Sequence, residues 1–152
     1  MTTHADFTEA EWDTVREGPT SAGMIITTAE RGGTFREVMA MAKAYTEARQ
    51  DHGASELLDE IVSAKPHVDH TRYSSPEELK QAGLQRVRDA VALLEAKASP
   101  EEVDEYRRFV VTLAEKVANA HREGGDSAVS DAERAAIEEI RGALGASPAA
   151  GE

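Results

Sequence analysis

The chain has 152 residues, about the size of one domain, and 17 Lys and Arg against 29 Asp and Glu give it a formal net charge of −12. Such a chain lacks the basic face that nucleic-acid binding requires, and an anionic membrane surface would repel it. Cys is absent, which excludes disulfides, thiol catalysis and thiolate metal sites.

No apolar run is long enough to cross a bilayer, and residues 1–6 lack the basic and apolar regions of a signal peptide. We therefore expect a cytoplasmic protein that does not insert into membranes. Aromatic residues make up only 5% of the chain, and Ala, the best helix former, takes their place. This composition favours short-range packing of helices on helices.

Capping boxes are the clearest local signal of helix starts. In a capping box a Ser or Thr accepts from an amide of the first turn, and a Glu three residues later reaches back to the cap amide. Five such pairs occur, at Thr8 and Glu11, Thr34 and Glu37, Ser75 and Glu78, Ser99 and Glu102, and Ser130 and Glu133. Their recurrence at helix-length spacing predicts an all-α fold.

The first half of the chain divides at its glycines and prolines. A first helix is predicted from Thr8 to Gly18-Pro19, with Phe7 and Trp12 packed together at its start. Thr20-Ser21 opens a second helix that runs to Arg31, and its segment 22–26 is apolar on all sides, which predicts a central position. A third follows Thr34 and ends at His52-Gly53.

In the second half, a short helix is predicted from Ser55 to Ala64, followed by a loop over residues 65–74. Long helices follow Ser75 and Ser99, the latter ending at Gly124, and a last one covers residues 131–144. Apolar residues recur at helical spacing in these long segments, as at Val103, Tyr106, Val110, Leu113 and Val117. We predict a single-domain bundle of about six helices over residues 1–145 and a flexible tail over residues 146–152.

The C-terminal hairpin, residues 117–125 followed by residues 129–140, resembles the tellurite-resistance TerB-like domains. In that family a helix ends in Ala-Asp-Gly, and a Ser-x-x-Glu box opens the next helix. Residues 29–33 followed by 34–37 echo the same pattern. The resemblance implies an all-helical interaction or regulatory module in a stress response. Here Glu123 and Asp126 flank the glycines, in place of the family's Asp before Gly.

Two groups of residues are candidates for metal binding. Carboxylates around the second glycine turn offer the hard oxygen ligands that Ca²⁺ or Mg²⁺ prefers, namely Glu123, Asp126, Asp131 and Glu133. The loop residues His67, Asp69 and His70 offer imidazole and carboxylate ligands for a transition metal. Capping and helix-dipole roles explain the carboxylates without a metal, and a solvent-exposed loop is the favoured interpretation of the histidines, so our primary expectation is that no cofactor binds.

Motifs of catalysis are missing from the sequence. It contains no Gly-x-Ser-x-Gly elbow, no phosphate-binding glycine loop, no Glu-x-x-His and no His-Glu-x-x-His. We therefore interpret the chain as a non-enzymatic interaction or regulatory module with a protein partner or self-association, using a groove lined by Met24, Met39 or Met41. The alternatives are a divalent-metal-binding module and an enzyme on a helical scaffold with no recognisable motif.

Overall fold

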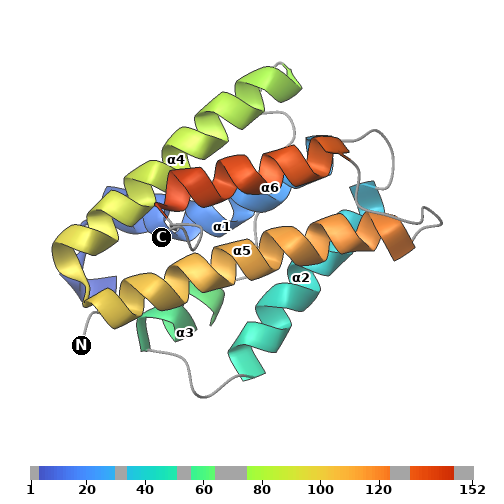
Figure 1. The fold of residues 1–152 in the computed structure, drawn as a ribbon. Helices are drawn as coiled ribbons and strands as arrows, with labels where there is room; N and C mark the ends of the chain where they lie inside the picture. The colour runs from blue at the N-terminus through green and yellow to red at the C-terminus, as the bar shows by residue number, and fades with distance from the viewer. Residues whose placement is uncertain (1–3, 30–33, 51–55, 64–74, 124–130, 146–152) are drawn as a thin grey trace.

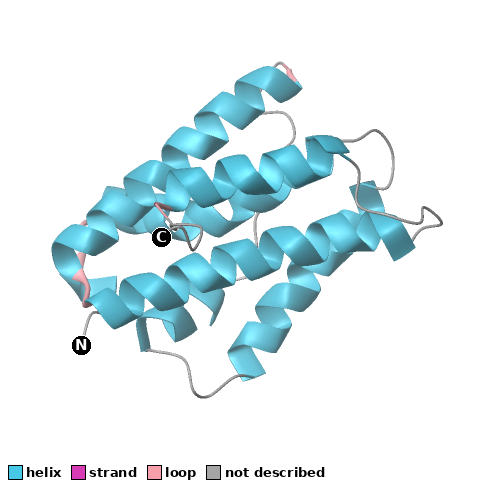
Figure 2. Cartoon of the chain, in the orientation of Figure 1, coloured by secondary structure: helices cyan, strands magenta, loops and turns pink. Residues whose placement is uncertain are grey.

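The structure, a computed structural model, describes residues 4–29, 34–50, 56–63, 75–123 and 131–145. A 3-10 turn, η1 (His4–Asp6), precedes six helices: α1 (Glu9–Ala29), α2 (Thr34–Gln50), α3 (Glu56–Ser63), α4 (Pro76–Lys97), α5 (Pro100–Glu123) and α6 (Asp131–Leu144). No strand occurs in these ranges, so the predicted all-α bundle is confirmed (Figure 2). The predicted loop 65–74 and tail 146–152 lie outside the described residues.

Helix α1 is the centre of the bundle. It contacts α2, α4, α5 and α6, and every residue from Gly18 to Ile26 is buried. Figure 1 shows α6 lying over α1 between α4 and α5, while α2 and α3 lie on the other side of α5. The all-round apolar character of residues 22–26 predicted this central position, which is confirmed.

The prediction that Gly18-Pro19 ends the first helix is wrong. Helix α1 continues through Pro19 to Ala29, so the first two predicted helices are one. Proline inside a helix lacks the N–H that should donate to the carbonyl four residues earlier, here that of Val15. A buried carbonyl without a donor would be costly, and a proline is expected to break a helix for this reason.

A side chain from another helix replaces the missing donor. The hydroxyl of Tyr106, on α5, donates to the carbonyl oxygen of Val15 at 2.8 Å, and both residues are buried. Gly18 makes room for this contact, because a Cβ there would overlap the Tyr106 hydroxyl. The helix therefore continues through the Gly-Pro pair, and the absence of a side chain at Gly18 leaves a notch in its surface. The hydroxyl end of Tyr106 fits into this notch.

Two of the predicted capping boxes are formed with both hydrogen bonds, and a third is formed with the bond to its serine. The amide of Glu11 donates to Thr8 Oγ1 at 3.1 Å, and the amide of Thr8 donates to Glu11 Oε1 at 2.9 Å. Ser99 and Glu102 exchange the same two bonds at 3.2 and 2.9 Å. At α4, Ser75 Oγ accepts from the amide of Glu78 at 3.1 Å. The side chains of the other two boxes lie outside the described part.

The predicted apolar stripes form the core. Val103, Tyr106, Val110, Leu113 and Val117 of α5 are all buried, as is the α4 stripe of Leu84, Val87, Val91 and Leu94. Near the N-terminus the ring centroids of Phe7 and Trp12 lie 5.7 Å apart, and both side chains are buried, which confirms their predicted contact. Helix α2 adds Tyr45 to the core. Its ring packs edge-to-face with that of Phe109, with the two ring centroids 5.3 Å apart.

Candidate functional site

The predicted acidic metal site falls at the edge of what the structure describes. Glu123 is the last residue of α5, while Asp131 opens α6 and Glu133 lies in its first turn. Their side chains, and all of Asp126, lie outside the described residues. The same holds for His67, Asp69 and His70. Both metal sites therefore stay predictions.

Within the described ranges, no group of three or more His, Asp or Glu side chains is placed to hold a metal ion. Several carboxylates instead form ion pairs between helices. Lys80 meets Glu139 at 2.9 Å (α4 to α6), Arg86 meets Glu17 at 3.0 Å (α4 to α1), and Arg141 meets Glu115 at 3.0 Å (α6 to α5).

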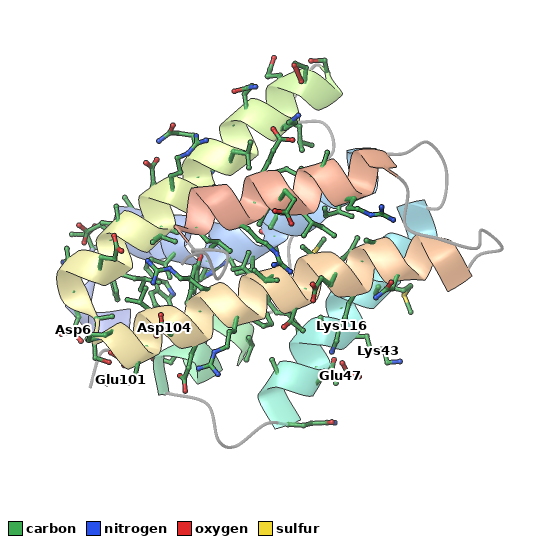
Figure 3. All side chains as sticks on the ribbon, viewed as in Figure 1. Asp6, Lys43, Glu47, Glu101, Asp104 and Lys116 are labelled. Carbon is green, nitrogen blue, oxygen red and sulfur yellow. The ribbon has the colours of Figure 1, made fainter. Side chains whose placement is uncertain are left out.

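A fourth interhelical pair joins α5 to α2 and is visible in Figure 3, where Lys116 lies beside Glu47. The hydrogen bond and charge of Lys116 hold the pKa of Glu47 below its usual value. These pairs are partly exposed, so each contributes little to stability. They orient helices and give no chemistry of their own.

Lys97 fastens the N-terminal segment to the end of α4. Its Nζ donates to the carbonyl oxygen of Asp6 at 2.9 Å, pairs with Glu11 Oε1 at 3.2 Å and lies 5.5 Å from the centre of the Phe7 ring. The hydrogen bond from the Thr8 amide, and then Lys97, lower the pKa of Glu11. This charged residue therefore has a structural role.

Arg107 makes a similar junction of three helices. Its Nε donates to the carbonyl oxygen of Leu144 at 2.8 Å, which caps the C-terminal end of α6. Its two terminal nitrogens donate to Glu95 of α4 at 2.8 Å and to Asp104 of α5 at 3.3 Å. Gly145 follows in the left-handed conformation, with φ 71°, typical of a residue that ends a helix.

The buried polar groups are also structural. Glu102 is buried because it completes the capping box of α5. Burial raises the pKa of Tyr106 and of Tyr45 well above the usual tyrosine value, so both rings stay neutral at physiological pH. A neutral Tyr106 retains the proton that it donates to Val15.

The three methionines proposed to line a groove differ in their surroundings. Met24 and Met41 are buried core residues, and the side chain of Met41 lies against Gly23 of α1. Met39, two residues before Met41, has 56% of its surface exposed. Among the described residues Met39 is the only large apolar side chain that is exposed to solvent.

The sequence did not reveal the roles of Arg107 and Lys97, because their partners are distant in the chain or are main-chain carbonyls. The Gly-Pro pair inside a strongly helical segment was the one available signal for Tyr106, since such a helix needs a replacement donor. None of these residues brings a set of reactive groups together.

No known protein-family model, curated protein or solved structure matches this chain. No helix of the described ranges has the length and hydropathy needed to span a bilayer.

Proposed function

We propose that this chain is a non-enzymatic helical module that acts by binding another protein or a second copy of itself. The observation that carries the proposal is Met39, a flexible apolar side chain that is 56% exposed on α2. The other face of the same helix is anchored in the core by Met41, Ala44 and Tyr45. A rigidly held helix that presents an apolar residue suits a docking surface.

The charges around Met39 support the same interpretation. Lys43 lies one turn along α2 and is exposed, and Glu47 lies one turn further, paired with Lys116 of α5 (Figure 3). An apolar side chain beside a rim of both charges is typical of the border of a protein interface. The net charge of −12 argues against a nucleic-acid partner.

We further propose that the module is TerB-like and acts in a stress response. Support for this assignment comes from the sequence pattern of residues 117–125 and 129–140, whose described parts lie in α5, which ends at Glu123, and α6, which begins at Asp131. We also propose a cytoplasmic location, on the grounds of the acidic, cysteine-free sequence.

A photo-crosslinking amino acid placed at position 39 tests the interaction in cells that make the full chain. We expect covalent adducts with one defined protein, or with a second copy of the chain, in preference to a spread of products. The matched control carries the same amino acid at Ala92, an exposed residue of α4. If the yield and the spread of adducts at position 39 were the same as at position 92, the result would contradict the proposal.

Sedimentation of the purified chain separates the two kinds of partner. If the partner is a second copy, Met39→Glu weakens the dimer, whereas Ala92→Glu adds the same charge elsewhere and leaves it unchanged. If the chain is monomeric throughout, the adducts at position 39 must contain another protein for the proposal to stand.

A further inference from the structure

Helix α6 buries fewer apolar side chains than α1, α4 or α5. It lies over α1 between α4 and α5 (Figure 1) and contacts all three. Among its described residues Ile140 and Leu144 are fully buried, Ala136 and Ala143 are also buried, and Ile137 packs partly buried against the core. Helix α5 by contrast buries eight apolar residues: Val103, Tyr106, Phe109, Val110, Leu113, Ala114, Val117 and Ala118. The apolar contribution to the docking of the 14-residue α6 is therefore smaller than that of the 24-residue α5.

Two ion pairs also hold α6 to its neighbours. Lys80 of α4 pairs with Glu139, and Glu115 of α5 pairs with Arg141, so an ion pair flanks α6 on each side. All four side chains are between 34 and 47% exposed, so salt screens these pairs and each is weak.

A further polar contact lies at the C-terminal end of α6. Arg107 Nε donates to the carbonyl oxygen of Leu144 at 2.8 Å, and the same guanidinium donates to Glu95 of α4 at 2.8 Å. The side chain of Arg107 is only 21% exposed, so this contact is better shielded from water than the flanking pairs. One side chain of α5 thus holds the end of α6 against α4.

Docking of α6 also leaves one polar group unsatisfied. Arg141 Nε is buried and has no hydrogen-bond partner among the described residues, although the terminal nitrogen of the same side chain pairs with Glu115. A buried donor without an acceptor opposes the docked state, because water would satisfy it once the helix moved away. This observation is independent of the smaller apolar contribution and points the same way.

We propose that α6 undocks from α1, α4 and α5 as a unit while these three helices stay folded, and that Arg107 is the latch that holds it. Helices with few buried apolar contacts open at a lower free energy than the whole protein. The proposal rests on the contacts of α6 alone and does not depend on the proposed function.

Single introduced thiols test the proposal cleanly, because the chain has no cysteine of its own. Ala136→Cys places a thiol on the buried face of α6, and Ala114→Cys places a matched one on the buried face of α5. Under native conditions we expect a thiol reagent to label position 136 more than about tenfold faster than position 114, which corresponds to an opening free energy lower by 1.4 kcal/mol. Equal labelling rates at the two positions would overturn the proposal.

Arg107→Gln then tests the latch in each of the two thiol backgrounds. We expect labelling at position 136 to rise roughly tenfold, since a hydrogen bond from a charged donor is lost, and labelling at position 114 to stay the same. Arg108→Gln is the matched control, because Arg108 is exposed and donates only to a main-chain carbonyl of its own helix. An equal rise at both positions would show general destabilisation and would exclude the latch.

Hydrogen exchange of the protein without introduced thiols gives a second measurement if a thiol variant does not fold. Amides of α6 should exchange through an opening whose dependence on denaturant is weaker than that of global unfolding, and exchange should be faster as salt rises. Exchange of α6 only together with α1 would overturn the proposal.

Discussion

The Tyr106 hydroxyl donates to the carbonyl oxygen of Val15, the one carbonyl of α1 that Pro19 deprives of its helical donor. Both groups are buried, so neither has water as an alternative partner. The contact joins α5 to the central helix at the notch formed by Gly18. It explains how a helix with an internal Gly-Pro pair remains continuous at the centre of the bundle.

Tyr106→Phe should destabilise the protein by about 1 to 3 kcal/mol, because it leaves the Val15 carbonyl buried without a donor. Urea unfolding measures the loss. Pro19→Ala restores a main-chain N–H for the same carbonyl, so the cost of Tyr106→Phe should shrink in that background. Additive effects of the two substitutions would show that the hydroxyl does not replace the proline's missing donor.

Gly18→Ala and Gly142→Ala should have opposite effects, although both glycines lie in helices. At Gly18 the new methyl would overlap the Tyr106 hydroxyl, which should cost about 1 to 3 kcal/mol. At Gly142 a Cβ meets nothing within 4 Å, so the substitution should stabilise α6 by about 0.5 to 1 kcal/mol. Thermal melts of the two variants measure the difference, and shifts of the same sign would contradict it.

Ser99→Ala should cost about 1 kcal/mol, because Ser99 Oγ accepts from the amide of Glu102 at the start of α5. Chemical denaturation measures the change. The exposed Ser75 of α4 accepts one similar bond, so Ser75→Ala should show a loss of the same order. An unchanged midpoint for Ser99→Ala would mean that the cap bond does not stabilise α5.

Glu11 should contribute to the pH dependence of stability. Its folded-state pKa lies below the ordinary value of 4.5, chiefly because of the hydrogen bond from Thr8 and then Lys97. The stabilisation is therefore present above the unfolded-state pKa and is lost as pH falls through the folded-state pKa. Between about pH 6 and about pH 3, Glu11→Gln should lose less thermal stability than the wild type. Glu138→Gln, at an exposed site on α6, controls for the change in net charge.

Millimolar Ca²⁺ or Mg²⁺ at low ionic strength should leave the melting temperature unchanged, because caps and the helix dipole already account for the acidic residues near the second glycine turn. A cation at a hundred times its dissociation constant would instead stabilise the fold by about 2.7 kcal/mol. Such a gain, abolished by Asp126→Asn together with Glu133→Gln, would establish the divalent-metal alternative.

The sequence by itself determined the helix starts at Thr8, Ser75 and Ser99 and the apolar faces that form the core. A capping box links residues three apart, and a stripe repeats every three or four residues, so both can be read locally. The tertiary structure alone decided that α1 crosses Gly18-Pro19, because the replacement donor for Val15 comes from Tyr106, 91 residues along the chain. It also decided that Met24 and Met41 are core while Met39 faces solvent, since burial depends on which neighbouring helices cover each position.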